Sequence, residues 1–342
     1  MKKFVVVTGG SGYIGSHTIV EIFEKTNYEV ISIDNFSNSY EEAYDNIFKI
    51  TNKKVISIQC DICNQKELFE KLLPYANNIH AIIHFAAFKS VPESVNYPFK
   101  YYHNNIQSLL NISEFAIIHK ISNFIFSSSC SVYGDIKVSP VTENTPLPLP
   151  NSPYAHTKQI GEQILQQLVY ISKLPLKILS LRYFNPVGAH SSGLIGELPK
   201  YNLTGLVPNL IRSVLGKIPA LEIYGNDYST KDGTPIRDYV HVSDIARAHV
   251  LAMMKMDSIT EKNYYDVINL GTGKGNTVLD VIQTFEKVTS EKVNYKFAPR
   301  REGDVEAIYA NNDKALKELN WKPEYSLEDM LYSAWQWGKN RY

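Results

Sequence analysis

The sequence predicts an α/β fold with a doubly wound parallel sheet and a smaller α/β substrate-binding domain. Short β-branched, apolar runs recur along the first half of the chain with almost no polar alternation, which is typical of strands buried on both faces of a parallel sheet. Segments with apolar residues at helical spacing separate these runs, so strands and helices alternate. The expected strands are Phe4–Val7, Val30–Ile33, Val55–Ile58, Ala81–Phe85, Phe124–Phe126 and Ile178–Leu181.

The second half of the chain has a different texture. After Tyr183, glycine and proline interrupt any regular period until an expected helix over Pro208–Leu215. Apolar runs at Tyr239–Val242 and Val267–Leu270 are expected to return as strands to the first sheet. We therefore predict one domain over residues 1–184, joined by later strands within 238–270, and a smaller domain over most of 185–342.

Composition excludes several classes of partner. Lys and Arg number 35 and Asp and Glu number 35, a formal net charge of +0, so neither nucleic acid nor a membrane surface is expected as a partner. The longest apolar stretches fall far short of the ~20 residues that a membrane span needs. Three cysteines do not make a disulfide framework, and the C-x-x-C of Cys60 and Cys63 lacks the second pair that zinc would need. We expect a soluble, cytoplasmic protein without a metal site.

A glycine-rich loop follows the first expected strand. Gly9, Gly12 and Gly15 form a G-x-x-G-x-x-G pattern that encloses Tyr13 and Ile14 and runs into a helical segment. Glycine suits this loop because the turn is tight, a pyrophosphate must approach the backbone, and the helix must pack close to the strand. The helix N-terminus then offers amide donors and a positive dipole to phosphates. The pattern predicts a Rossmann-type dinucleotide site.

The ends of the second and third expected strands indicate which dinucleotide binds. Asp34 lies 25 residues after Gly9, close to where a carboxylate accepts the adenosine ribose hydroxyls. This carboxylate would repel a 2′-phosphate, and no arginine follows at Asn35 or in the next four residues, so NAD is favoured over NADP. Asp61 and Ile62 could hold the adenine, although a helix N-cap role for Asp61 is nearly as good an alternative.

A tyrosine and a lysine form the candidate catalytic pair. Tyr154 and Lys158 have i, i+4 spacing on an expected helix. A phenol with a pKa near ~10 is a poor base at neutral pH, but a neighbouring ammonium and a cationic nicotinamide favour the phenolate. Ser129 ends an expected buried strand, and its hydroxyl could share the substrate proton with Tyr154.

Three longer runs give the chain a family resemblance. They read GGSGYIGSH at residues 9–17, RYFNPVGAH at 182–190 and APRREGD at 298–304. With Ser129, Tyr154 and Lys158, they resemble the UDP-glucose 4-epimerase family of the extended short-chain dehydrogenase/reductase superfamily, over essentially the whole chain. The resemblance implies that Tyr154, held as phenolate by Lys158 and helped by Ser129, takes the 4-hydroxyl proton of a UDP-hexose while NAD removes hydride from C4. The 4-keto sugar then rotates about its link to the diphosphate and receives the hydride on its other face, which inverts the configuration at C4.

The resemblance also implies which residues bind the two ligands. Asn185, Arg237 and Arg301 match residues that contact the diphosphate in the family. Arginine suits this role because its guanidinium donates to two oxygens at once. A surface salt bridge is the alternative for each arginine. The cofactor-binding residues are Gly9, Gly12, Tyr13, Ile14, Gly15, Asp34, Asn35, Asp61, Ile62, Phe85, Ala86, Ala87, Lys89, Asn104, Ser127, Tyr154, Lys158 and Tyr183. The substrate-binding residues are Lys89, Ser129, Tyr154, Phe184, Asn185, Leu206, Tyr224 at the uracil, Arg237, Arg301, Asp304 at the uridine ribose, and Ile308.

Two positions depart from the family pattern. Gly205 stands where the family usually has Asn before Leu206, which removes one polar contact to the substrate. Ile308 stands where the family has either a bulky Tyr or a small Cys facing the sugar, and its size is intermediate. We expect UDP-glucose and UDP-galactose as the main pair and poor turnover of N-acetylated sugars.

Several other functions compete with this one. They are 4-epimerisation of N-acetylated or uronic sugars, 4,6-dehydration, net reduction at C4, and a catalytically silent sensor of NAD or nucleotide sugars. Cys130 and Ser131 occupy the positions where a dehydratase needs an acidic pair, which argues against elimination. An intact Ser129, Tyr154 and Lys158 argues against a silent sensor. A homodimer is also expected, with pairing across the apolar helices 106–115 and 160–169, although burial within one subunit explains them almost as well.

Overall fold

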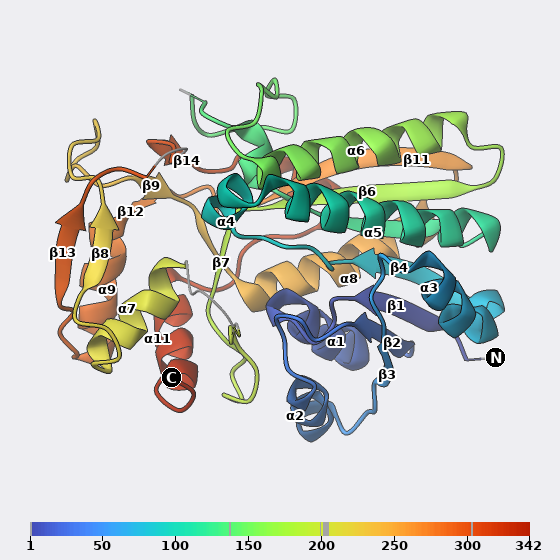
Figure 1. The fold of residues 1–342 in the computed structure, drawn as a ribbon, viewed down its shortest axis with the longest axis horizontal. Helices are drawn as coiled ribbons and strands as arrows, with labels where there is room; N and C mark the ends of the chain where they lie inside the picture. Colours follow the sequence, from blue (N-terminus) through green and yellow to red (C-terminus); the bar gives the residue numbers. More distant parts are fainter. Residues whose placement is uncertain (1, 137, 199, 201–204, 302–303) are drawn as a thin grey trace.

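A seven-stranded parallel sheet forms the centre of the molecule (Figure 1). The structure is a computed structural model that describes residues 2–136, 138–198, 200, 205–301 and 304–342. The strand order is β11-β6-β5-β4-β1-β2-β3, which is the order of a Rossmann-type dinucleotide-binding sheet with a seventh strand beside β6. The strands are β1 (Phe4–Thr8), β2 (Glu29–Asp34), β3 (Ile56–Gln59), β4 (Ile79–His84), β5 (Asn123–Ser129), β6 (Leu176–Tyr183) and β11 (Asn263–Leu270).

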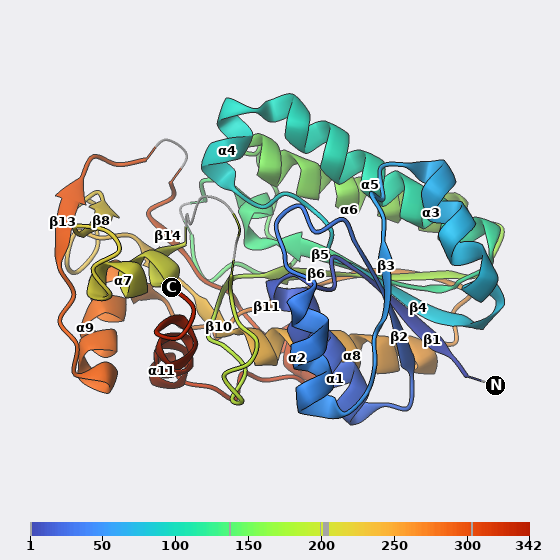
Figure 2. The same ribbon diagram turned by 60° about the horizontal axis from the view of Figure 1, so that its bottom comes forward.

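Helices cover both faces of this sheet, as a doubly wound fold requires (Figure 2). One apolar core joins one sheet face to α1 (Tyr13–Lys25), α2 (Glu42–Thr51), α8 (Val242–Ser258) and α10 (Asp313–Leu319). The other core joins the opposite face to α3 (Gln65–Leu72), α5 (Pro98–Ile118) and α6 (Pro153–Ile171). A short 3-10 helix, η1 (Leu73–Asn78), follows α3, α4 (Val91–Asn96) precedes α5, and η2 (Cys130–Tyr133) follows β5. The predicted fold class is confirmed.

Of the two later runs predicted to return to the main sheet, one joins it and the other does not. The run Val267–Leu270 belongs to β11, which pairs with β6 at the edge of the main sheet. The run Tyr239–Val242 does not return to that sheet: β10 (Tyr239–His241) pairs only with β7 (Asn185–Val187) in a separate two-stranded sheet. The run ends early because the His241 side chain accepts from the Ser243 amide and starts α8 at Val242. A short apolar run shows that a segment is buried, and it cannot show which sheet the segment joins.

The second half of the chain builds a smaller core beyond one end of the sheet (Figure 1). This core packs α7 (Leu206–Val214), α9 (Val278–Thr289) and α11 (Leu327–Gly338) against β7, β8 and β10. The helix predicted over Pro208–Leu215 is α7, which starts two residues earlier. The short strands of this part are β8 (Leu221–Tyr224), β9 (Ile236–Arg237), β12 (Asn276–Thr277), β13 (Tyr295–Ala298) and β14 (Ala307–Ile308). Across the described ranges, no helix is long and apolar enough to cross a membrane.

Candidate active site

A large cleft lies between the carboxyl ends of the sheet strands and the smaller core. Its volume is about 1630 Å³, larger than the ~300–1,000 Å³ typical of a site for one small ligand. It includes the ends of β1 and β4, where the strand order reverses and where open α/β sheets bind ligands. All the residues predicted to bind the cofactor line this cleft, together with Ser129, Phe184, Asn185 and Leu206 from the predicted catalytic and substrate sets.

The glycine loop is shaped by close backbone contacts. Gly9 has a φ of +70°, which L side chains rarely adopt, and its amide donates to the Ile33 carbonyl. A Cβ on Gly15 would lie 2.3 Å from the Gly9 carbonyl oxygen, so only glycine lets α1 approach the loop this closely. Gly12 is the N-cap of α1 and has no side chain to cap the helix. The first amides of α1 therefore point toward the cleft with a positive helix dipole, as a pyrophosphate requires.

Asp34 is held in place at the carboxyl end of β2. Its carboxylate accepts from the Ser11 amide at 3.1 Å, and its second oxygen accepts from the Phe36 amide at 2.9 Å. Ser39 Oγ donates to the same second oxygen. Three donors thus fix the carboxylate beside the glycine loop, where an adenosine ribose would lie.

Asp61 follows the neighbouring strand β3, which ends at Gln59, but it does not cap a helix. Its side chain accepts from the Cys63 amide, whereas Asn64 is the N-cap of α3 and accepts from the Glu67 amide. The N-cap alternative for Asp61 is therefore wrong, and its carboxylate lines the cleft. Cys60 and Cys63 are free thiols. In the part of the chain that the structure describes, no three His, Cys, Asp or Glu side chains are grouped to hold a metal ion.

The catalytic candidates converge where β5 meets the start of α6. Ser152 caps α6 by accepting from the Ala155 amide, so Tyr154 and Lys158 fall on the first two turns. Ser129 lies beside Tyr154, close enough for its hydroxyl to lower the pKa of Tyr154, and the Lys158 ammonium donates to the Ser127 carbonyl oxygen at 2.7 Å. The ammonium lies 6.0 Å from the centre of the Tyr154 ring. Ser129, Tyr154 and Lys158 thus lie together in the lining of the cleft, and their catalytic roles stay a prediction.

Burial opposes the charged form of both groups. Desolvation raises the pKa of Tyr154 to about 12, with the Ser129 hydrogen bond acting in the opposite direction. Desolvation lowers the pKa of Lys158 to about 7, and the Glu162 carboxylate opposes that change. Burial therefore opposes the phenolate in the protein alone, and the sequence prediction relies on two positive charges, Lys158 and a cationic nicotinamide. The remaining stabilisation must come from a further positive charge in the cleft.

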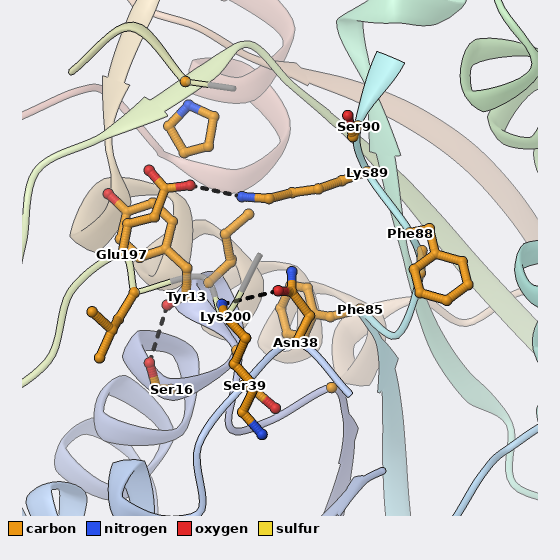
Figure 3. Close-up of a pocket in the computed structure, with 18 of the residues that line it drawn as sticks. Tyr13, Ser16, Asn38, Ser39, Phe85, Phe88, Lys89, Ser90, Glu197 and Lys200 are labelled. Atoms are coloured by element: carbon orange, nitrogen blue, oxygen red, sulfur yellow. Dashed lines mark hydrogen bonds and ion pairs between the residues drawn. The ribbon is translucent and has the colours of Figure 1, made fainter. Parts of the chain in front are cut away.

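The mouth of the cleft contains contacts that sequence reasoning missed (Figure 3). Lys89, a predicted ligand contact, forms an ion pair with Glu197 at 2.8 Å. Lys200 reaches the other wall: its ammonium donates to the Phe36 carbonyl at 2.7 Å, and its amide donates to Asn38. Glu197 and Lys200 lie in an irregular segment without hydrophobic periodicity, so the sequence offered no signal that would place them at the site.

Among the described residues, five that are predicted to bind the UDP-sugar, all in the second half of the chain, lie outside the lining of the large cleft. Arg301 Nε lies 3.0 Å from Asp304 Oδ2, and its guanidinium stacks 4.5 Å from the centre of the Tyr224 ring. Arg237 and Ile308 are partners in the pairing of β9 with β14. None of these five residues lines the large cleft as the described residues define it, and Ile308 is buried in the core under the sheet.

The residues in the large cleft fit an NAD molecule. The glycine-only approach of α1 to its loop leaves room for a pyrophosphate, and the fixed carboxylate of Asp34 suits two ribose hydroxyls better than a 2′-phosphate. Lys158 and Tyr154 lie at the other end of the same cleft, where a nicotinamide would supply a positive charge. The fold and the site together define an enzyme of the nicotinamide-dependent, short-chain dehydrogenase type.

Comparison of the sequence with known proteins shows to which family within this class the chain belongs. The model of the family described as GDP-mannose 4,6 dehydratase matches residues 6–334. A UDP-glucose 4-epimerase of Dictyostelium discoideum is 43% identical over 97% of this chain and 95% of its own length, and that of Bacillus subtilis is 43% identical over 97% and 96%. The chain therefore belongs to the UDP-glucose 4-epimerase family.

Solved structures agree with this assignment. A UDP-glucose 4-epimerase from Stenotrophomonas maltophila, with bound NAD and formylated UDP-arabinopyranose, superposes with a TM-score of 0.93 at 38% identity and covers 99% of this chain and 98% of its own. The enzyme from Bifidobacterium longum, in complex with NAD+ and UDP, has a TM-score of 0.92 at 42% identity with the same coverage.

Proposed function

We propose that this protein is an NAD-dependent epimerase that acts at C4 of UDP-hexoses and interconverts UDP-galactose and UDP-glucose. The single observation that carries the proposal is the meeting of Ser129, Tyr154 and Lys158 at one end of a cleft that begins at the glycine loop. Family membership over nearly the whole chain supports the same reaction. Cys130 and Ser131, in place of an acidic pair after Ser129, disfavour the dehydration named in the family description.

Each catalytic residue has a task that its surroundings suit. Tyr154 takes the proton from the sugar 4-hydroxyl and later returns it, and Ser129, which lies beside Tyr154, shares that proton. Lys158, fixed by the Ser127 carbonyl, favours loss of the Tyr154 proton by its positive charge. NAD supplies hydride acceptance from C4 and its return, so no cofactor is consumed. A general base of this kind contributes ~10²–10⁴-fold to turnover.

The two ends of the nucleotide-binding surface receive separate proposals. The cofactor-binding set binds NAD in the large cleft, with Gly9–Gly15 at the pyrophosphate and Asp34 at the adenosine ribose. Asn185, Arg237 and Arg301 hold the substrate diphosphate, and Asp304 and Tyr224 hold the uridine. The division of labour follows the predicted domains, residues 1–184 for NAD and mainly residues 185–342 for the UDP-sugar.

The sugar preference is carried over from the family resemblance, at Gly205, which lines the large cleft, and at Ile308, which is buried and does not line it. By that resemblance an isoleucine leaves less room than a cysteine for a 2-acetamido group, so UDP-N-acetylglucosamine should turn over at least ~10-fold more slowly than UDP-glucose, a factor that one misfit of ~1–3 kcal/mol provides. The assay compares both sugars in the wild type and in Ile308→Tyr, which should lower the ratio further. Comparable turnover of the two sugars in the wild type would overturn this preference.

A homodimer is part of the proposal. Phe99, Leu110 and Ile118 on α5, and Tyr170 and Ile171 on α6, expose large apolar surfaces. A second copy of the chain would cover them, and sedimentation equilibrium should give twice the mass of one chain. A monomer at micromolar concentration would contradict the pairing. Three free cysteines fit a reducing cytoplasm, which we propose as the location.

The experiment that tests the proposed activity needs no added cofactor. Purified protein is incubated with UDP-galactose, and the nucleotide sugars are separated by chromatography. UDP-glucose should form until the two sugars reach equilibrium, and Tyr154→Phe in parallel should form almost none. Absence of UDP-glucose from protein that carries NAD would contradict epimerisation, whereas UDP-glucose formation only with an added reductant would favour a net reductase.

A further inference from the structure

A buried ion pair lies directly behind the catalytic helix. Arg182 on β6 donates to both carboxylate oxygens of Glu162 on α6, at 2.9 Å and 2.6 Å. The two side chains are 4% and 5% exposed. Ser128 Oγ donates to the same carboxylate at 2.5 Å. Replacing a buried ion pair by apolar residues is often neutral or stabilising, so stability alone does not explain why the pair is here.

The pair continues the register of the catalytic residues. Tyr154, Lys158 and Glu162 follow one another at four-residue spacing along one face of α6. Two of them hydrogen-bond consecutive residues of β5: Lys158 donates to the Ser127 carbonyl, and Glu162 accepts from the Ser128 hydroxyl. Glu162 is thus the second hydrogen bond that sets the height of α6 against β5, and Tyr154 lies beside Ser129 at the end of the same strand.

The other side of the pair is anchored across the sheet. Arg182 also donates to the Tyr133 hydroxyl at 2.9 Å, and Tyr133 donates to Asn269 on β11 at 2.7 Å. All the members of this chain of contacts are buried. Glu162 is therefore tied to β5, β6 and β11, and a shift of α6 along β5 would break several hydrogen bonds together.

We infer that Glu162 is a positioning residue for the proposed epimerisation: with Arg182, it holds α6 at the height where Tyr154 and Lys158 meet the sugar carbon. The inference rests on the proposed function. Glu162 does not line the cleft and acts only through Lys158 and Tyr154.

The charges around Lys158 agree with this role. Burial lowers the pKa of Lys158, and the Glu162 carboxylate is the group that raises it. From β4, His84 faces Lys158; burial and the Lys158 charge lower the pKa of His84 to about 3, so it stays neutral. From β6, Tyr183 faces Tyr154, and burial raises its pKa so that it too stays neutral. Arg182, the remaining charged neighbour, is paired with Glu162.

The test replaces Glu162 by glutamine, which keeps the size and removes the charge. Glu162→Gln should lower kcat about tenfold and move the alkaline limb of the pH profile to lower pH by about one unit, because Lys158 then releases its proton more easily. The affinity for UDP should stay within about twofold, since the uridine residues are untouched. Ultraviolet difference titration against the matching Tyr154→Phe protein should show the Tyr154 proton leaving at higher pH in Glu162→Gln.

Two further variants separate positioning from stability. Glu162→Gln leaves Arg182 buried without its partner, so Tm should fall, and adding Arg182→Met should recover Tm but not kcat. Asp244→Asn removes a buried carboxylate that pairs with Arg247 on α8, a helix on the opposite face of the sheet from α6, and should lower Tm while the pH profile stays unchanged. Recovery of kcat together with Tm in the double variant, or a wild-type pH profile in Glu162→Gln, would overturn the inference. If the wild type itself forms no UDP-glucose, the proposed function fails instead, and the Tyr154 titration still measures the effect of Glu162.

Discussion

The two ends of the binding surface are built in different ways. At the cofactor end, Gly9 and Asp34 sit at the ends of five- and six-residue strands that have hydrogen-bonded neighbours on both sides. At the end proposed to bind uridine, Arg237 and Ile308 lie on two-residue strands, and Arg301 is held by its contacts to Asp304 and Tyr224. The backbone of a continuous sheet thus fixes one end, and pairs of side chains fix the other.

The difference predicts how each end responds to substitution. A change in the sheet-anchored end displaces backbone that many hydrogen bonds hold, so its effect should be nearly all or none. A change at the uridine end removes one contact among several, so its effect should be graded and should fall on substrate affinity. The variants below test this contrast, beginning with the largest expected effect.

Tyr154→Phe should abolish most of the turnover and leave the binding of NAD and UDP unchanged. Removal of the general base should lower kcat by ~10²-fold or more. Retained NAD, measured by absorbance after denaturation, and UDP affinity, measured by calorimetry, should match the wild type because the ring remains in place. Turnover within a few-fold of the wild type would show that another group takes the proton.

Gly15→Ala should abolish retention of NAD. The new Cβ would lie 2.3 Å from the Gly9 carbonyl oxygen, so α1 must move away from the phosphate-binding loop. We expect at least a tenfold loss of cofactor affinity, equivalent to more than ~1.4 kcal/mol. Gly216→Ala is the control, since a Cβ there meets nothing within 4 Å although φ is +66°. Equal NAD content in the two variants would remove the role assigned to the loop.

Arg301→Gln should produce a graded loss at the uridine end. A lost hydrogen bond to a charged group is worth ~1.5–3 kcal/mol, so KM for UDP-galactose should rise by about tenfold or more while kcat changes little. Arg300→Gln provides the matched control, because Arg300 is exposed and pairs with Asp227 instead. An equal rise in KM for both variants would mean that the general charge of this surface matters, and not the position of Arg301.

Lys158→Met should stabilise the protein while it inactivates the enzyme. Burial lowers the pKa of Lys158 from 10.5 to about 7, so below pH 7 the folded protein carries the full cost of a buried ammonium. Between pH 7 and 10.5 the unfolded chain holds a proton that the folded protein has released, and the cost shrinks as pH rises. Thermal melts should show a gain of about 1–2 kcal/mol at pH 6 and a smaller gain at pH 9. A gain that does not depend on pH would contradict the buried charge.

The contrast between a site fixed by sheet backbone and a site fixed by side-chain contacts also explains how much the sequence could predict. Uniformly apolar runs identify strands buried on both faces, so all seven strands of the main sheet, the glycine loop and Asp34 were predictable, and the strand ends bring the site residues to one edge. Tyr239–Val242 was assigned to the wrong sheet because a short apolar run carries no information about its partner. The ion pair of Lys89 with Glu197 and the burial of Ile308 depend on side-chain packing between segments far apart in sequence, which has no periodic signal.

In the proposed reaction, hydride leaves C4 of the sugar, stays on the bound cofactor and returns to the same carbon, while Tyr154 carries the proton. UDP-galactose with deuterium at C4 tests it most directly. The UDP-glucose that forms in ordinary water should keep deuterium at C4, and Tyr154→Phe should slow its formation without changing the label. UDP-glucose that has exchanged its C4 deuterium for solvent hydrogen would contradict the claim.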